Sequence, residues 1–129
     1  MANEFGVDIK NAQVAATAEI LANLQLRIHV GALPGAFTAL PAGALLVAMD
    51  LPAITHNPPS NGTATLASQL SGINTAGGQA GCYVVVDGNG KVYQRGDVTV
   101  TSGSGGLKLP SLALAAGVET RINAFPLYV

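Results

Sequence analysis

The sequence predicts an all-β protein, a jelly-roll-like antiparallel β-sandwich of about 7–8 short strands that follows one short N-terminal helix. From residue 24 onward, apolar and polar residues alternate, and Gly, Pro or Asn turn signals return about every ten residues. No βαβ pattern is present, which disfavours a doubly wound parallel sheet. The length of 129 residues fits one domain. We therefore expect a flexible arm over residues 1–10 and a single domain over residues 11–129.

The helix is expected over residues 11–24, a segment without Pro or Gly that is rich in the good helix formers Ala and Leu. Its apolar residues recur at helical spacing, at Val14, Ala18, Leu21 and Leu24. Either Asp8 or Asn11 can cap its first turn.

The strands follow from the change of period from 3.6 to 2 after the helix. They are expected over residues 24–30, 44–51, 63–70, 81–86, 91–101, 107–114 and 118–129. Loops are expected over residues 31–43, 52–62, 71–79 and 102–106, where Gly, Pro, Ser and Asn gather. Residues 87–90 (DGNG) carry the strongest hairpin signal, and Gly96 is a candidate bulge.

The composition excludes several classes of protein. Only 10% of the residues are charged and the formal net charge is −1, whereas an ordinary domain is about 25% charged. Six Lys and Arg without a run argue against nucleic-acid binding, and the high apolar content argues against disorder. No apolar stretch approaches the roughly 20 residues of a membrane span. One cysteine and no visible secretory signal favour folding in a reducing cytoplasm.

The sequence offers no catalytic or metal-binding motif, so we expect no enzyme, no metal and no cofactor. His29, His56 and Cys82 do not stand at ligand spacing, and the seven acidic residues do not cluster. The glycine cluster around Ser104 matches neither a nucleophile elbow nor a phosphate-binding loop. Cys82 is expected to be a buried, inert thiol, whereas both histidines are expected at the surface.

Several strand and turn motifs occur in a recognisable order. They are residues 24–31 (LQLRIHVG), 41–49 (PAGALLVAM), 80–90 (AGCYVVVDGNG), 105–109 (GGLKL), 116–118 (AGV) and 122–125 (INAF). This order resembles a family of small tailed-bacteriophage capsid cement, or head decoration, proteins. His29 departs from the aromatic residue usual at its position, and the Asn-Pro-Pro loop at 57–59 is particular to this chain.

The resemblance implies a jelly-roll-like virion protein on the outer surface of the head, assembled in the cytoplasm of the bacterial host. Such a protein bridges neighbouring major capsid proteins and stabilises the shell. The major capsid protein is then its partner, together with a second copy of itself, with a homodimer favoured and a trimer possible. Nucleic acid and membrane are not expected partners.

Capsid contacts are expected from the N-terminal arm and the two long loops, with the polar face of the first strand as a secondary candidate. The candidate residues are Asn3, Phe5, Pro34, Phe37, His56, Pro58, Arg27 and His29. Two alternatives stay open: a tail or head–tail connector protein, and a carbohydrate-binding β-sandwich module on the virion. The second has thin support, because the chain has no Trp and only three Tyr to stack on a sugar.

Overall fold

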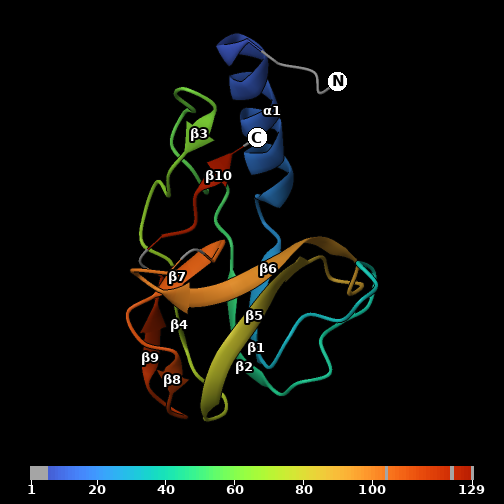
Figure 1. The fold of residues 1–129 in the computed structure, drawn as a ribbon, viewed down its shortest axis with the longest axis vertical. Helices are drawn as coiled ribbons and strands as arrows, with labels where there is room; N and C mark the ends of the chain where they lie inside the picture. The colour runs from blue at the N-terminus through green and yellow to red at the C-terminus, as the bar shows by residue number, and fades with distance from the viewer. Residues whose placement is uncertain (1–5, 104, 123, 129) are drawn as a thin grey trace.

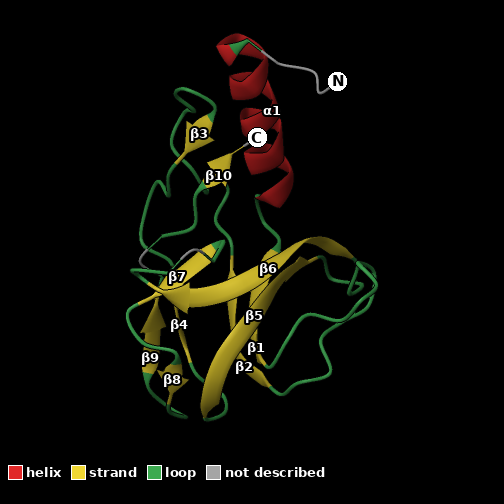
Figure 2. Ribbon diagram, in the orientation of Figure 1, coloured by secondary structure: helices red, strands yellow, loops and turns green. Residues whose placement is uncertain are grey.

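The computed structural model describes residues 6–103, 105–122 and 124–128, which form a β-rich fold with one helix (Figures 1 and 2). The elements are α1 (Val7–Leu21), β1 (Gln25–Val30), β2 (Leu45–Asp50), β3 (Thr63–Ala64), β4 (Ser71–Ile73), β5 (Gly78–Val86), β6 (Val92–Val100), β7 (Leu107–Leu109), β8 (Ala113–Leu114), β9 (Glu119–Arg121) and β10 (Leu127–Tyr128). The prediction of an all-β fold with one N-terminal helix is thereby confirmed at this level.

The main sheet is curled and has the strand order β2-β1-β5-β6-β7, with β8 pairing the start of β5. Two short pairs, β3 with β10 and β4 with β9, complete the described strands. The pairs β1–β2, β1–β5 and β5–β6 are antiparallel, as expected, and β5 joins β6 through the predicted hairpin at residues 87–90. The carboxylate of Asp87 tightens this turn by accepting hydrogen bonds from the backbone N–H groups of Asn89 and Lys91.

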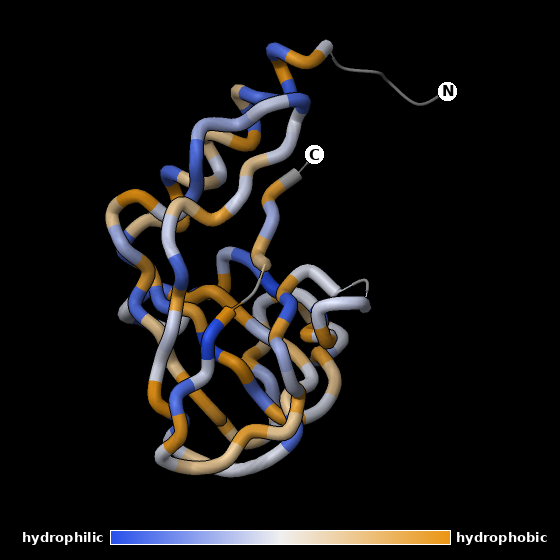
Figure 3. Tube along the Cα trace, turned by 90° about the vertical axis from the view of Figure 1, so that its left-hand side faces the viewer, coloured by the Kyte–Doolittle hydropathy of each residue, from blue (hydrophilic) through white to orange (hydrophobic). Residues whose placement is uncertain are grey.

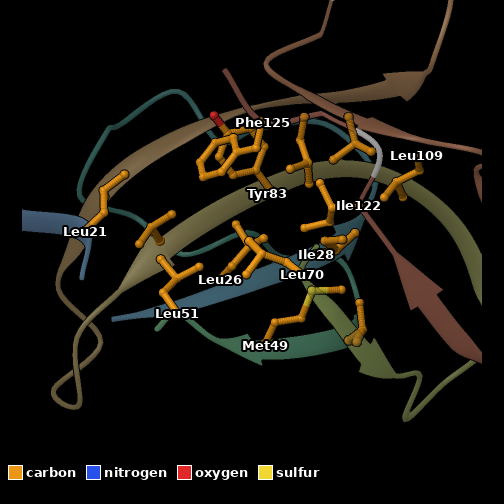
Figure 4. Packing of buried hydrophobic residues seen from close by; sticks show 14 of the residues in the cluster. Leu21, Leu26, Ile28, Met49, Leu51, Leu70, Tyr83, Leu109, Ile122 and Phe125 are labelled. Atoms are coloured by element: carbon orange, nitrogen blue, oxygen red, sulfur yellow. The ribbon is translucent and has the colours of Figure 1, made fainter. Parts of the chain in front are cut away.

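The core lies on the inner face of the curled sheet, where alternate residues of β1 and β5 point. Phe125 and Tyr83 meet at its centre with ring centroids 5.4 Å apart in an edge-to-face arrangement (Figure 4). Leu26, Ile28 and Val85 are fully buried in the same cluster. The short pair β4–β9 covers this core from the side of β2, since Gly72 approaches the side chain of Val47. The apolar period-2 pattern of β1 and β5 therefore builds most of the core.

Helix α1 stands above the sheet beside β3 and β10 rather than across a sheet face (Figure 1). Val14 and Leu21 are its buried residues and Ala18 packs against the core, which confirms the predicted stripe. The helix begins at Val7, so residues 7–10, expected in a flexible arm, are helical instead. Neither Asp8 nor Asn11 caps it: Gly6 occupies the N-cap without a side-chain bond, and Asp8 lies in the first turn, where a carboxylate complements the helix dipole.

The helix ends at Leu21, three residues before the expected end at Leu24. Asn23 adopts φ 64°, a left-handed conformation that stops an α-helix. Leu24 is nevertheless packed against the core, at the point where the chain enters β1. Leu24 therefore packs on the core although it lies outside the helix. Its helical spacing from Leu21 could not show on which side of the helix end it would fall.

Four predicted strand and loop segments have the wrong boundaries. The strand expected over 63–70 shrinks to Thr63–Ala64, while the loop expected over 71–79 contains β4 and the start of β5. Glycine disfavours strands in isolation, yet Gly72 and Gly78 are needed here because side chains of β1 and β2 lie about 3 Å from where their Cβ atoms would be. The strands expected over 107–114 and 118–129 each divide into two short ones.

The purely antiparallel prediction is also wrong, because β7 runs parallel to β6. Gly103 and Gly105 approach the side chain of Thr99 so closely that a Cβ on either would lie under 3 Å from it. Because these two glycines have no side chains, the connection can fold back along β6. Strand β7 then begins at Leu107, which pairs with Val98 of β6. Gly96 is not a bulge: it leaves room for the ring of Tyr83.

Candidate interaction surface

The long loop over residues 31–43, named here the capping loop, lies on the outer face of the main sheet. The guanidinium of Arg95 on β6 donates hydrogen bonds to the backbone carbonyls of Pro34 (2.5 Å) and Ala36 (3.1 Å). The same guanidinium lies 5.3 Å from the ring centroid of Phe37, which is 48% exposed. Arg95 thus holds the loop to the sheet with its main aromatic side chain facing solvent.

The capping loop buries His29, which was expected at the surface. Alternation does place His29 on the outer face of β1, but the loop covers that face and leaves the side chain 9% exposed. Its Nδ1 lies 3.0 Å from the carbonyl oxygen of Gly43, to which it donates a hydrogen bond. Among the described groups, its Nε2 is buried without a hydrogen-bond partner. His29 therefore anchors the end of the loop instead of offering a contact surface.

Cys82 is fully buried, as expected, and its neighbours contact both ends of the capping loop: Gly81 lies against Gly31, and His29 binds Gly43. In the sheet register it stands between His29 on β1 and Asp97 on β6. Burial raises the pKa of its thiol, and the nearby carboxylate of Asp97 raises it further. The thiolate is the reactive form, so burial and the raised pKa both lower the reactivity of this cysteine.

The second long loop, residues 52–62, is pinned to the core by His56, a residue predicted to be exposed. His56 is 6% exposed, and its Nε2 donates to the carbonyl of Phe125 at 2.7 Å. Its Nδ1 lies 2.9 Å from the hydroxyl of Thr55. The prediction failed because a Pro-rich loop is normally solvated, whereas this one folds back on residues 69 positions away in the chain. Pro58, in contrast, is exposed.

We expect the protein to lose stability as the pH falls below about 6.5, and His56 to contribute to that loss. Burial lowers the pKa of His56, and the hydrogen bond to Phe125 only partly opposes this. The unfolded chain therefore binds a proton at a higher pH than the folded chain, so the contribution of His56 to the free energy of unfolding is fully present above that pH and falls below it. Urea unfolding at pH 7 and pH 5 checks this, with His56→Gln as the control. An equal loss of unfolding free energy in the two proteins would contradict the assignment to His56.

Apolar side chains are exposed where the second long loop meets the last turns of α1. Ile54, on the second loop, is 72% exposed, and Ile20 on α1 is 57% exposed. Thr55 lies within 3.5 Å of the carbonyl of Ala18, so this loop runs along the last turns of α1. Hydrophobic segments accordingly recur on the upper part of the molecule as well as in the sheet below it (Figure 3).

A groove of about 320 Å³ separates α1 from the upper edge of β6. It is lined by Val14, Thr17, Tyr83, Gln94, Arg95, Gly96, Gly106, Pro126 and Leu127. Gln94 donates from Nε2 to the hydroxyl of Tyr83 at 3.3 Å. Sequence reasoning missed this groove, because its walls come from five separate segments of the chain.

The structure groups some of the predicted contact residues and separates others. Pro34 and Phe37 come together at Arg95, which the sequence analysis did not single out. Arg27 is half-buried on β1, where its Nε donates to the side chain of Gln25 at 2.7 Å. Asn3 and Phe5 lie outside the described residues. The one available signal for Arg95 was a charged residue in the middle of a strand of a chain with few charges.

The described residues contain no three His, Cys, Asp or Glu side chains that could together hold a metal ion. In the same part of the chain, no helix is long and apolar enough to cross a membrane. Comparison with protein-family models, with curated proteins and with solved structures gives no match.

Proposed function

We propose that this protein is a bacteriophage virion structural protein, a capsid cement (decoration) protein. It binds the outer surface of the head and bridges neighbouring major capsid proteins, and it forms a homo-oligomer, with a dimer favoured. The observation that carries the proposal is a weakly charged surface with apolar side chains at separate places, including Ile20, Phe37 and Ile54. The order of the strand and turn motifs along the chain supports it independently.

Such a surface suits binding through many weak contacts spread over a large interface, rather than through one high-affinity site. The capping loop and the 52–62 loop are long, but Arg95 and His56 fix their conformations before any partner binds. Less conformational entropy is then lost on binding. Many modest contacts, repeated over a symmetric shell, give a high total affinity.

We retain the jelly-roll-like sandwich in this proposal, supported by the curled sheet and by the β4–β9 pair, which packs directly against β2. The positions of two of the three tyrosines weaken the carbohydrate-binding alternative. Tyr83 is buried against Phe125, and Tyr93 lies beneath the ammonium group of Lys91, 5.0 Å from its ring centroid. Neither ring offers a free stacking platform.

A cryo-electron microscopy reconstruction of the phage particle tests the proposal. We expect density for this fold on the outer shell in icosahedral register. Because few ion pairs are available for screening, raising the salt from 0.05 to 0.5 M, about a threefold change in Debye length, should release little of the protein. Density confined to the tail or the connector, or its absence from the particle, would overturn the assignment.

A further inference from the structure

The strand β6 has an unpaired stretch on the edge that faces α1. It pairs with β5 from Val92 to Asp97, but within the described residues β7 pairs with it only at Val98–Val100. The segment Gln94–Gly96 therefore has a neighbouring strand on one side alone. In Figure 1, this edge of β6 lies below α1 and to one side of β7.

The main chain of Arg95 points toward this free edge. The carbonyl oxygen of Asp97 lies on the β7 side, 2.8 Å from the position that a Cβ on Gly105 would take. In a strand paired in antiparallel fashion, the N–H and C=O of every second residue point to the same side, so those of Arg95 share this direction. Its guanidinium binds the capping loop on the outer face. Arg95 thus offers the groove a backbone N–H and C=O that no strand among the described residues pairs.

Apart from Arg95, whose guanidinium is bound to the capping loop, the residues that line the groove along this edge are neutral. Their side chains are apolar, as in Val14 and Leu127, or neutral and polar, as in Thr17 and Gln94. Gly96 and Gly106 add backbone without side chains. Among the described groups, the side-chain oxygen of Gln94 is buried without a hydrogen-bond partner. This lining favours an uncharged occupant that supplies backbone donors and acceptors.

We propose that this groove receives an extended, uncharged segment of the major capsid protein, which adds a strand to the edge of β6. Backbone hydrogen bonds to Arg95 supply affinity, and the apolar and amide walls select small, neutral side chains. Helix α1 closes the groove on one side. The groove therefore admits a single extended chain, but not the sheet edge of a second copy of this protein, which carries its own helix. This partner rests on the function proposed above, whereas the binding mode follows from the edge itself.

A groove-filling variant tests the proposal. Thr17 is exposed at the groove rim, and Ala15 is exposed on the same helix outside the groove, so Thr17→Trp and Ala15→Trp form a matched pair. Each protein, with its fold checked by circular dichroism, is cosedimented with purified heads that lack it. We expect Thr17→Trp to bind at least tenfold more weakly than wild type and Ala15→Trp to bind as wild type does. Hydrogen exchange on the bound wild-type protein should show the Arg95 amide slowed at least tenfold.

The outcomes separate the two proposals. Wild-type binding with an unaffected Thr17→Trp variant, or with an unprotected Arg95 amide, overturns the groove and leaves the cement function standing. A wild-type protein that does not sediment with heads overturns the function and this partner together. Loss of self-association in Thr17→Trp at unchanged head binding assigns the groove to a second copy and overturns the capsid segment.

Discussion

Replacing Gly81 by Ala is expected to lower the free energy of unfolding by about 3 kcal/mol, the upper end of the cost of overpacking a well-packed site. Gly81 lies where the β1–β5 pairing shifts register, directly against the turn at Gly31. A Cβ there would lie 2.2 Å from the carbonyl oxygen of Gly31 and 2.8 Å from its nitrogen. Both are backbone atoms, so no side chain can rotate away, and β1 and β5 must separate locally.

Thermal and urea unfolding measure this effect, with an expected fall of about 10 °C in the melting temperature. Gly88→Ala is the matched control in the hairpin that follows β5. That glycine has no atom within 4 Å of the new methyl group and no positive φ, so we expect a change within about 0.5 kcal/mol. Equal melting temperatures for the two variants would show that the Gly31–Gly81 contact relaxes without cost.

Replacing Arg95 by Ala is expected to release the capping loop and to speed the reaction of Cys82 with a thiol reagent by about tenfold or more. Two charged hydrogen bonds to loop carbonyls and the contact with Phe37 are lost together. Loss of about 1.4 kcal/mol from the closed state corresponds to a tenfold larger open population, and hydrogen bonds to charged groups contribute about 1.5–3 kcal/mol each. Cys82 reports the opening because it is fully buried and its neighbours contact both ends of the loop.

Arg121→Ala is the control for this experiment. Arg121 is an exposed arginine on β9 whose described ion pair is with Glu119, so its loss should leave the labelling rate of Cys82 unchanged. Labelling is followed in low concentrations of urea to separate loop opening from global unfolding. An Arg95→Ala rate equal to that of wild type, or one that only follows global unfolding, would contradict the role of Arg95 in holding the loop.

The elements that were predicted correctly are those in which the local sequence pattern matches the pattern of burial in the tertiary structure. The alternation in β1, the hairpin at residues 87–90 and the stripe of Val14, Ala18 and Leu21 were all readable because burial follows a simple period there. The boundaries missed are those at which glycine was taken as a sign of loop. Gly72 lies within a strand because close approach to Val47 requires a residue without a side chain.

The candidate site was predictable only in part, for a related reason. Both long loops were located from Pro and Gly, and Phe37 and Pro58 are exposed as such loops suggest. His29 and His56 were expected at the surface because local sequence does not show that the capping loop folds back over β1, or that the 52–62 loop packs on Phe125. Arg95 binds a loop about 60 positions away in the chain, and the groove beside it is built from segments that range from α1 to β10.

The sequence by itself determined the β-rich class, the single helix, the low charge and the places where the chain turns. These properties depend on composition and on short-range periodicity, which each segment carries alone. Only the tertiary structure decided which face of the sheet the capping loop covers, which strands run parallel and where β6 is left without a neighbour. Those features depend on the order in which distant strands pair, and that order is set by packing of the whole chain.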